Sequence, residues 1–336
     1  IGGYPANITN TAAEKYAPIT NKTILSGDFD SNDVFSSNVT ISGNSENAYN
    51  VVTIAGNPNE AYLFKGFHIT GGNANGTSTI TVNTVAGVSL AQGGGINTRG
   101  RSSQNHSSYS ETADFPKVTL ENCVFYRNSA QFGGAVRFAS KIGAVLEGNI
   151  FYENLATMYG GAISSSAFRL ELTNNTIYKN RAQVYGGAMH KAKYNDDITT
   201  FTSIYLAFNI FSENIKGTTD KTSLGSDIGL ATSTTESNNI KINSGTIWPN
   251  RVQFDFNDMT SSFFTGNIFI WGGGVFTEPV EFFDIQNYDF RLKYSYNLFS
   301  YSSFYGQEDD KVDINGLPRR IGRDVDLGAH EWQYAA

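Results

Sequence analysis

The chain of 336 residues has one cysteine, 7 prolines and no long apolar run. Its single cysteine, Cys123, excludes an intramolecular disulfide and any metal site that needs two cysteines. Since a membrane-spanning helix needs roughly 20 mostly apolar residues, we expect no transmembrane segment. Basic residues are also scarce, at 24 against 31 acidic residues, and they form no stripe. Nucleic-acid binding depends on clustered Lys and Arg, so the composition argues against it.

What the chain has instead is a short repeat between residues 118 and 214. An apolar residue, two further residues and an asparagine are followed by a Gly-Gly-Ala turn. The asparagine recurs at Asn128, Asn154 and Asn180, so the period is 154 − 128 = 180 − 154 = 26 residues. A fourth copy at Asn214 comes 214 − 180 = 34 residues later, which indicates an insertion of 34 − 26 = 8 residues. A fixed period of this length without a helical pattern is typical of a solenoid whose units stack.

Each copy contains three short runs in which apolar and polar residues alternate, for example 118–120, 124–126 and 135–138. Alternation over a few residues, bounded by Asn or Gly-Gly, is typical of strands joined by turns. Three strands and three turns close one turn of a parallel β-helix. The sequence therefore predicts an all-β fold, a single-stranded right-handed parallel β-helix of ten to twelve turns at ~26 residues each.

We expect one domain with three parts. Residues 1–22 form an N-terminal cap, because a solenoid must cover the strand edges at its open end. Residues 23–286 form the β-helix, and residues 287–336 form a closing segment of the same domain. The polar stretches 99–114 and 193–202 are expected to project as loops, where binding groups are often placed. Disorder is the competing interpretation for the first of them.

Stacked copies place like residues over one another, and asparagine suits such a stack. It tolerates the left-handed turn conformation, and its amide can bond both its own backbone and the next asparagine. We expect two structural ladders, one of Asn128, Asn154, Asn180 and Asn214, and one of Asn149, Asn175 and Asn209. Cys123 takes the matching place in the first copy of the second ladder, as a small buried residue. The inward apolar column is expected to be Phe125, Phe151, Ile177 and Phe211.

The paired Phe-x-x-Asn and Gly-Gly-Ala-Ile signatures, as at 151–154 and 160–163, resemble the repeats of polymorphic outer-membrane proteins and of right-handed parallel β-helix repeat proteins of the bacterial surface. The segments 313–319 and 324–331, with the lead-in 287–292, are similar to the ending of a subgroup that finishes in a variable membrane anchor or secretion signal. The resemblance implies a pectate-lyase-like fold and an extracytoplasmic address, secreted or at the cell surface. No anchor follows the motif, and we expect it to be lost or absent.

One outward column of the stack offers candidate functional residues. If Val136 and its equivalents point inward, the neighbouring positions are Asn97, Arg137, Ser164 and His190, with Arg99 and Ser166 two residues further on. Arg137 can pair with a uronate carboxylate and His190 can transfer a proton, so these two are the candidate catalytic pair. Asn97, Arg99, Ser164 and Ser166 are candidate ligand-binding residues. Unrelated solvent-facing side chains are the alternative interpretation, and the column lacks the paired acids that glycoside hydrolysis requires.

A cation site is the other candidate. Asp28, Asp30 and Asp33 lie close together in sequence, and hard cations such as calcium take clustered oxygen ligands. The glycine and final glutamate of a recognised calcium loop are missing, so solvated turn acids remain the alternative. Calcium is the one cofactor that the sequence suggests.

For function, we favour a monomeric, secreted or surface-displayed β-helix protein that binds glycans or another surface, in the manner of an adhesin and without chemistry of its own. Tyrosine-rich polar surfaces suit sugars, which need both stacking and hydrogen bonds. The second hypothesis is a polysaccharide lyase or glycoside hydrolase that acts on a uronate-containing polysaccharide. The third is a passive structural spacer, which would bind no glycan.

Overall fold

The computed structural model describes most of the repeat region and parts of both ends. The described residues are 1–5, 16–57, 60–100, 116–139, 142–167, 169–192, 203–207, 209–218, 228–230, 239–243, 248–249, 268–271, 282–292, 311–318 and 328–330. Both predicted loops fall outside this set, apart from Arg99 and Gly100. Within it, none of the helices is long and apolar enough to span a bilayer.

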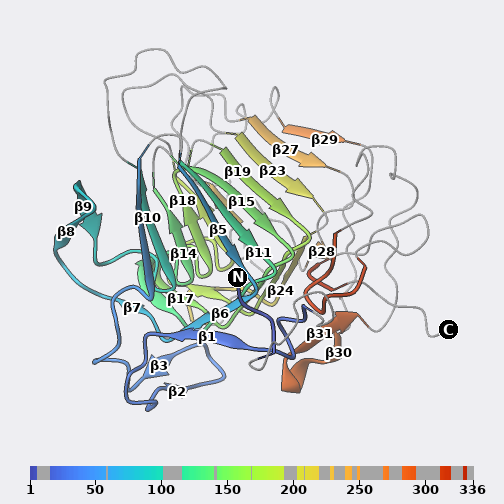
Figure 1. Cartoon of the computed structure of the whole chain (residues 1–336), viewed down its shortest axis with the longest axis horizontal. Helices are drawn as coiled ribbons and strands as arrows, with labels where there is room; N and C mark the ends of the chain where they lie inside the picture. Colours follow the sequence, from blue (N-terminus) through green and yellow to red (C-terminus); the bar gives the residue numbers. More distant parts are fainter. Residues whose placement is uncertain are drawn as a thin grey trace.

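The body of the molecule consists of four parallel sheets, and several of their strands are labelled in Figure 1. Sheet I contains β1 (Thr23–Ser26), β6 (Phe67–Thr70), β12 (Val124–Tyr126), β16 (Ile150–Tyr152), β20 (Thr176–Tyr178), β24 (Ile210–Ser212) and β28 (Trp248–Pro249). Sheet II contains β4 (Val52–Gly56), β10 (Ile96–Gly100), β14 (Val136–Phe138), β18 (Ile163–Ser165), β22 (Met189–Lys191) and β26 (Ile228–Leu230).

The other two sheets complete the circuit of the chain. Sheet III contains β5 (Ala61–Lys65), β11 (Lys117–Glu121), β15 (Gly143–Glu147), β19 (Arg169–Thr173), β23 (Ser203–Ala207), β27 (Asn239–Asn243) and β29 (Ile268–Trp271). Sheet IV contains β7 (Asn73–Ala74), β13 (Ser129–Phe132), β17 (Leu155–Tyr159), β21 (Arg181–Ala182) and β25 (Ile215–Lys216).

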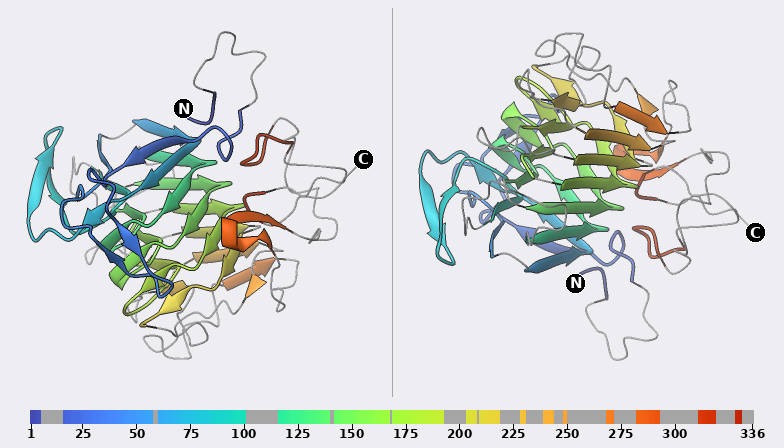
Figure 2. Two further views of the ribbon diagram at one scale, coloured as in Figure 1. Left: turned by 90° about the horizontal axis from the view of Figure 1, so that it is seen from below. Right: turned by 90° about the horizontal axis from the view of Figure 1, so that it is seen from above.

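The chain visits the sheets in a fixed order, because β11, β12, β13 and β14 lie in sheets III, I, IV and II and β15 returns to sheet III. Every strand of β11 to β14 pairs in parallel with its counterpart one circuit later. Both views in Figure 2 show the strands of successive circuits lying side by side. The molecule is thus all-β, with parallel strands stacked in several sheets, an arrangement compatible with the predicted β-helix.

From β11 to β26 each circuit has four strands rather than the three that the sequence predicted. The additional one lies in sheet IV, between the ladder asparagine and the Gly-Gly pair, as β13 and β17 do. β13 reads Ser-Ala-Gln-Phe, and only Ala130 and Phe132 are apolar. Because so short and polar a run lacks clear alternation, its strand character depends on pairing with the circuits on either side.

The interior between the sheets is filled by apolar columns. Phe125 pairs with Phe151, Phe151 with Ile177 and Ile177 with Phe211 in the register of sheet I, and all four side chains are fully buried. The rings of Phe125 and Phe151 are parallel, with centroids 4.8 Å apart. A residue at one of these positions therefore packs on its own equivalent, which explains why the sequence repeats.

Two columns of buried asparagines run along the corners of the stack. In the first, the Nδ2 atoms of Asn128, Asn154 and Asn180 donate to the Oδ1 atoms of Asn154, Asn180 and Asn214, at 3.1, 2.9 and 3.1 Å. In the second, Asn149 and Asn175 donate to Asn175 and Asn209, each at 2.9 Å. Cys123 begins this column, where its backbone N–H donates to Asn149 Oδ1 at 2.9 Å. The amides thereby satisfy polar backbone groups that no water can reach.

In the first ladder the left-handed conformation falls on the residue before each asparagine and not on the asparagine itself, although asparagine tolerates it. Arg127, Glu153, Lys179 and Glu213 have φ between 51° and 58°. This shift has a physical reason, since the asparagine side chain must point inward to reach its equivalent in the next circuit. The residue before it turns the corner and points outward.

The C-terminal segments lie along the outer face of sheet I. The hairpin of β30 (Phe282–Asp284), helix η3 (Ile285–Asn287) and β31 (Asp289–Leu292) contributes Phe282 and Phe290 to an apolar cluster with Val124, Ile150 and Tyr152. Ile314 and Ala329 are buried in the same cluster. The described parts of the expected closing segment therefore cover the side of the stack.

We predict that Asn154→Ala destabilises the fold by on the order of 3 kcal/mol, because it leaves several buried backbone and amide groups without partners. Asn154 Oδ1 accepts from the backbone and side chain of Asn128, and its Nδ2 donates to Phe125 O. The exposed Asn38→Ala is the matched control. Urea unfolding monitored by circular dichroism measures both, and equal midpoints for the two variants would contradict a stabilising ladder.

Candidate functional site

Arg137 lies on the outer side of sheet II, between the core residues Val136 and Phe138. Its guanidinium donates to Ser166 Oγ at 3.0 Å, to Ser164 Oγ at 3.4 Å and to Phe138 O at 3.1 Å. Gln92 Oε1 accepts a further bond from its Nε at 3.4 Å. The structure thus brings Arg137, Ser164 and Ser166 together, as the sequence predicted from their spacing.

All of these acceptors are neutral, and no carboxylate pairs with Arg137 among the described residues. Burial, with a smaller contribution from the nearby charge of Arg99, lowers the pKa of Arg137 to about 10. A guanidinium with this value is still charged at neutral pH. It is therefore a partly buried positive charge without a counterion, which is the condition for attracting an anion.

His190 lies two strands away from Arg137, through the register Arg137–Ser164–His190. Adjacent strands are ~4.8 Å apart, which places the two backbones roughly 10 Å apart. The imidazole is buried and stacks on the ring of Tyr159, with centroids 4.6 Å apart. Burial, reinforced by Arg137 and Lys191, lowers its pKa to about 3. His190 is thus neutral at physiological pH and cannot act there as an imidazolium acid.

Lys191 is a third basic residue in this region, and the sequence analysis missed it. It pairs with Ser165, which pairs with the core residue Phe138, so it occupies an inward position. Its ammonium donates to Ala167 O at 2.9 Å and to Ala192 O at 3.2 Å. Burial lowers its pKa to about 7, with a smaller contribution from Arg137. A lysine in an otherwise apolar or small-residue column was the available signal.

The remaining candidates of this column, Asn97 and Arg99, differ in their exposure to solvent. Asn97 is buried, and its Nδ2 donates to Ser89 O at 2.7 Å, which fastens the hairpin of β8 (Thr79–Val82) and β9 (Val85–Ser89) to β10. Arg99 is exposed beside Gly87 of the same hairpin. The column is therefore not an open row of solvent-facing groups, since Asn97, Ser164 and His190 are buried.

A row of aromatic rings borders the basic residues where sheet IV meets sheet II. Phe132 and Tyr159 have ring centroids 5.7 Å apart, and Tyr159 and Tyr185 lie parallel at 6.0 Å. All three rings are half-buried, and Lys216 lies over Tyr185 at 4.7 Å. Because Tyr159 also stacks on His190, this row is continuous with the Arg137 region. We call Arg137, His190 and these three rings the basic–aromatic face.

The acidic residues near the N-terminus are grouped differently from our expectation. Carboxylate oxygens of Asp28, Asp33 and Glu46 lie within 4.8 Å of one another, and Asp30 is not part of this group. Burial and the neighbouring charges of Asp28 and Glu46 raise the pKa of Asp33, although a hydrogen bond from Asn47 opposes this. Glu46 was missed because it lies 46 − 33 = 13 residues beyond Asp33 in sequence.

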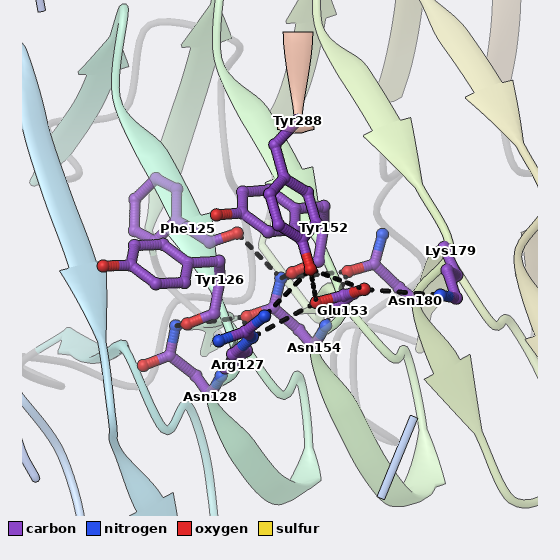
Figure 3. Close-up of polar contacts among 10 residues, drawn as sticks. All are labelled: Phe125, Tyr126, Arg127, Asn128, Tyr152, Glu153, Asn154, Lys179, Asn180 and Tyr288. Carbon is purple, nitrogen blue, oxygen red and sulfur yellow. Dashed lines mark hydrogen bonds and ion pairs between the residues drawn. The ribbon is translucent and has the colours of Figure 1, made fainter. Parts of the chain in front are cut away.

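A further charged cluster fastens the C-terminal hairpin to sheet I (Figure 3). The buried carboxylate of Glu153 pairs with Arg127 at 3.2 Å and with Lys179 at 3.4 Å. Tyr288 donates its hydroxyl to Glu153 at 3.1 Å, accepts from Arg127 at 2.8 Å and stacks on Tyr152. Each charged side chain of this cluster has a partner of opposite sign within it, and we assign the cluster a structural role.

No family model, curated protein or solved structure matches the chain. The resemblance to polymorphic outer-membrane proteins therefore stays a prediction from its short motifs.

We predict that Lys191→Met changes how stability depends on pH. Below pH 7 the folded and unfolded states both hold the Lys191 proton, so the folded state bears the full cost of burying the charge. Between pH 7 and 10.5 only the unfolded state still holds it, so wild-type stability rises with pH. The wild type should gain a few kcal/mol relative to the variant across this window, at about 1.4 kcal/mol per pKa unit.

Urea unfolding at pH 6, 8 and 10 measures this difference. The exposed Lys117→Met is the control and should keep the wild-type pH profile. A gap between wild type and Lys191→Met that stays constant with pH would show that Lys191 is not buried with a lowered pKa.

Proposed function

We propose that this protein is a right-handed parallel β-helix, secreted or displayed on the bacterial surface, that binds carboxylate-bearing glycans without chemically altering them. The observation that carries the proposal is the uncompensated charge of Arg137, held by Ser164 and Ser166. A planar guanidinium forms two parallel hydrogen bonds with a carboxylate, which suits a uronate group.

The aromatic row supports a sugar as the ligand. Phe132, Tyr159 and Tyr185 form a row of half-buried rings that reaches His190, and pyranose rings stack on such surfaces while their hydroxyls take hydrogen bonds. A repeating fold spaces its rings at regular intervals, which matches the repeating units of a polysaccharide. An acidic glycan would therefore meet both stacking and charge recognition on the basic–aromatic face.

Binding is favoured over catalysis because the groups of this face are poorly suited to proton transfer. His190 has a pKa of about 3, far from the value near 7 at which a general acid or base works best. No pair of carboxylates accompanies it among the described residues of this face, so the glycosidase mechanism lacks its two acids there. A lyase in which neutral His190 removes a proton beside a uronate held by Arg137 is the alternative.

The test measures binding of a uronate oligosaccharide and of its carboxyl-reduced neutral analogue by isothermal titration calorimetry. We expect saturable binding of the acidic glycan alone, weakened at least tenfold by Arg137→Ala and by added salt, because the contact is ionic. Arg169→Ala is the matched control, since Arg169 is an exposed arginine on sheet III already paired with Glu171. Circular dichroism confirms that each variant is folded.

Chromatography of the glycan after incubation separates the competing functions. Unchanged chain length together with binding supports the proposal. Shortened chains whose formation is abolished by His190→Ala would establish the lyase instead. Absence of binding to either glycan would leave a passive spacer.

A further inference from the structure

Three loops at the N-terminal end bring acidic side chains together. Asp28 follows β1, Asp33 precedes β2 (Val34–Phe35), and Glu46 follows β3 (Ile41–Ser42), the second strand of a short antiparallel hairpin. One carboxylate oxygen from each lies within 4.8 Å of the others. Since like charges at this distance repel, the fold must hold the group together by other contacts.

Backbone hydrogen bonds supply those contacts. Ala48 N donates to Gly27 O at 2.9 Å, which joins the loop of Glu46 to that of Asp28. Asn73 N donates to Ala48 O at 2.8 Å, and its side chain donates to Asn44 O at 2.6 Å, which ties the same loop to the next circuit. These bonds hold the loops of Asp28 and Glu46 against each other and against the next circuit.

Each of the three residues has an oxygen without a partner. Asp28 Oδ1, Asp33 Oδ1 and Glu46 Oε1 are all buried atoms without a hydrogen bond. None of the three residues forms an ion pair with a lysine or arginine among the described residues. A buried carboxylate oxygen is costly unless it is paired, so three in one place need a shared positive charge.

Asn47 gives an independent indication of a ligand. It is only 9% exposed, and its Nδ2 donates to Asp33 Oδ2 at 3.0 Å, so its carboxamide lies against the acidic group. Its Oδ1 is buried and has no hydrogen-bond partner. Amide oxygen and nitrogen are roughly 2.3 Å apart, so this neutral oxygen lies within roughly 5.3 Å of Asp33 Oδ2. Carbonyl oxygens of asparagine complete many cation sites.

We propose that Asp28, Asp33, Glu46 and Asn47 form a calcium-binding site. Calcium binds clustered protein oxygens at about 2.4 Å, whereas magnesium keeps several waters and is usually held by one or two carboxylates. The oxygens of Asp28, Asp33 and Glu46 lie within 4.8 Å of one another, close enough to bind one ion together, and three carboxylates with a carboxamide are the oxygen-rich ligand set that suits calcium. Glu46 replaces Asp30 in the ligand set that the sequence suggested.

The position of the site indicates what the ion does. The β2–β3 hairpin lies against the side of the stack, where Arg127 lies over the Phe35 ring at 4.8 Å and Arg181 donates to Asn38 O at 3.1 Å. These contacts are few, and the acidic loops flank the hairpin on both sides. A bound calcium ion joins the end of β1 to the loops before and after the hairpin, and so fixes the hairpin on sheet IV.

The test titrates calcium chloride into the full chain after treatment with a chelator, with isothermal titration calorimetry and the thermal midpoint as readouts. Wild type should bind calcium and melt at a higher temperature when calcium is present, because a ligand that binds only the folded state stabilises it. Asp33→Asn and Glu46→Gln should each raise the Kd for calcium at least tenfold. Asp30→Asn, which removes an exposed acid of the same loop, should bind as wild type.

The sign of the stability change separates an ion site from a merely structural cluster. Without calcium, Asp33→Asn should melt at or above the wild-type temperature, because it removes a repulsive charge. With calcium it should melt below the wild type. No binding of calcium by wild type at millimolar concentration, or equal binding by wild type and both variants, would overturn the proposal. A magnesium affinity equal to that for calcium would also contradict it.

Discussion

The buried asparagine ladders are the constraint on which the stack depends. At each corner the chain must turn, and a turn leaves backbone groups that the sheets on either side do not pair. Asn149 and Asn175 donate to Leu120 O and Leu146 O while they bond their equivalents in the next circuit. One side chain thereby satisfies a corner and fixes the register of the neighbouring circuit. Because the same bond recurs at each level, a shift of one residue would break the whole column.

Because the buried ladders fix the stack, the charged side chains on its surface can be arranged in different ways. Around Glu153 each charged side chain has a partner of opposite sign, and the cluster fastens the C-terminal hairpin. On the basic–aromatic face Arg137 has only neutral acceptors. In the N-terminal loops three carboxylates meet without a cation among the described residues. The basic–aromatic face thus has an excess of positive charge, and the N-terminal loops have an excess of negative charge. An ion or ligand of opposite charge gains most binding energy at such partly buried, unpaired groups.

Much of the stack could be read from the sequence, since a repeat of fixed period constrains both the strands and their register. The apolar column from Phe125 to Phe211 and the position of Cys123 follow from spacing alone. The fourth strand of each circuit could not be predicted in this way, because Ser129–Phe132 gains its strand character from neighbours in space. Nor could the buried state of His190, which depends on the ring of Tyr159 packing over it.

The sequence by itself determined which residues recur, and therefore which side chains lie over one another in successive circuits, since equal spacing along the chain becomes vertical alignment in a stack. Only the tertiary structure decided which groups meet across segments that do not repeat. Glu46 joins Asp28 and Asp33, Lys191 turns inward beside His190, and Tyr288 reaches Glu153 across 288 − 153 = 135 residues of chain. Such contacts produce no repeating spacing in the sequence, because each depends on how one particular loop or hairpin packs on the stack.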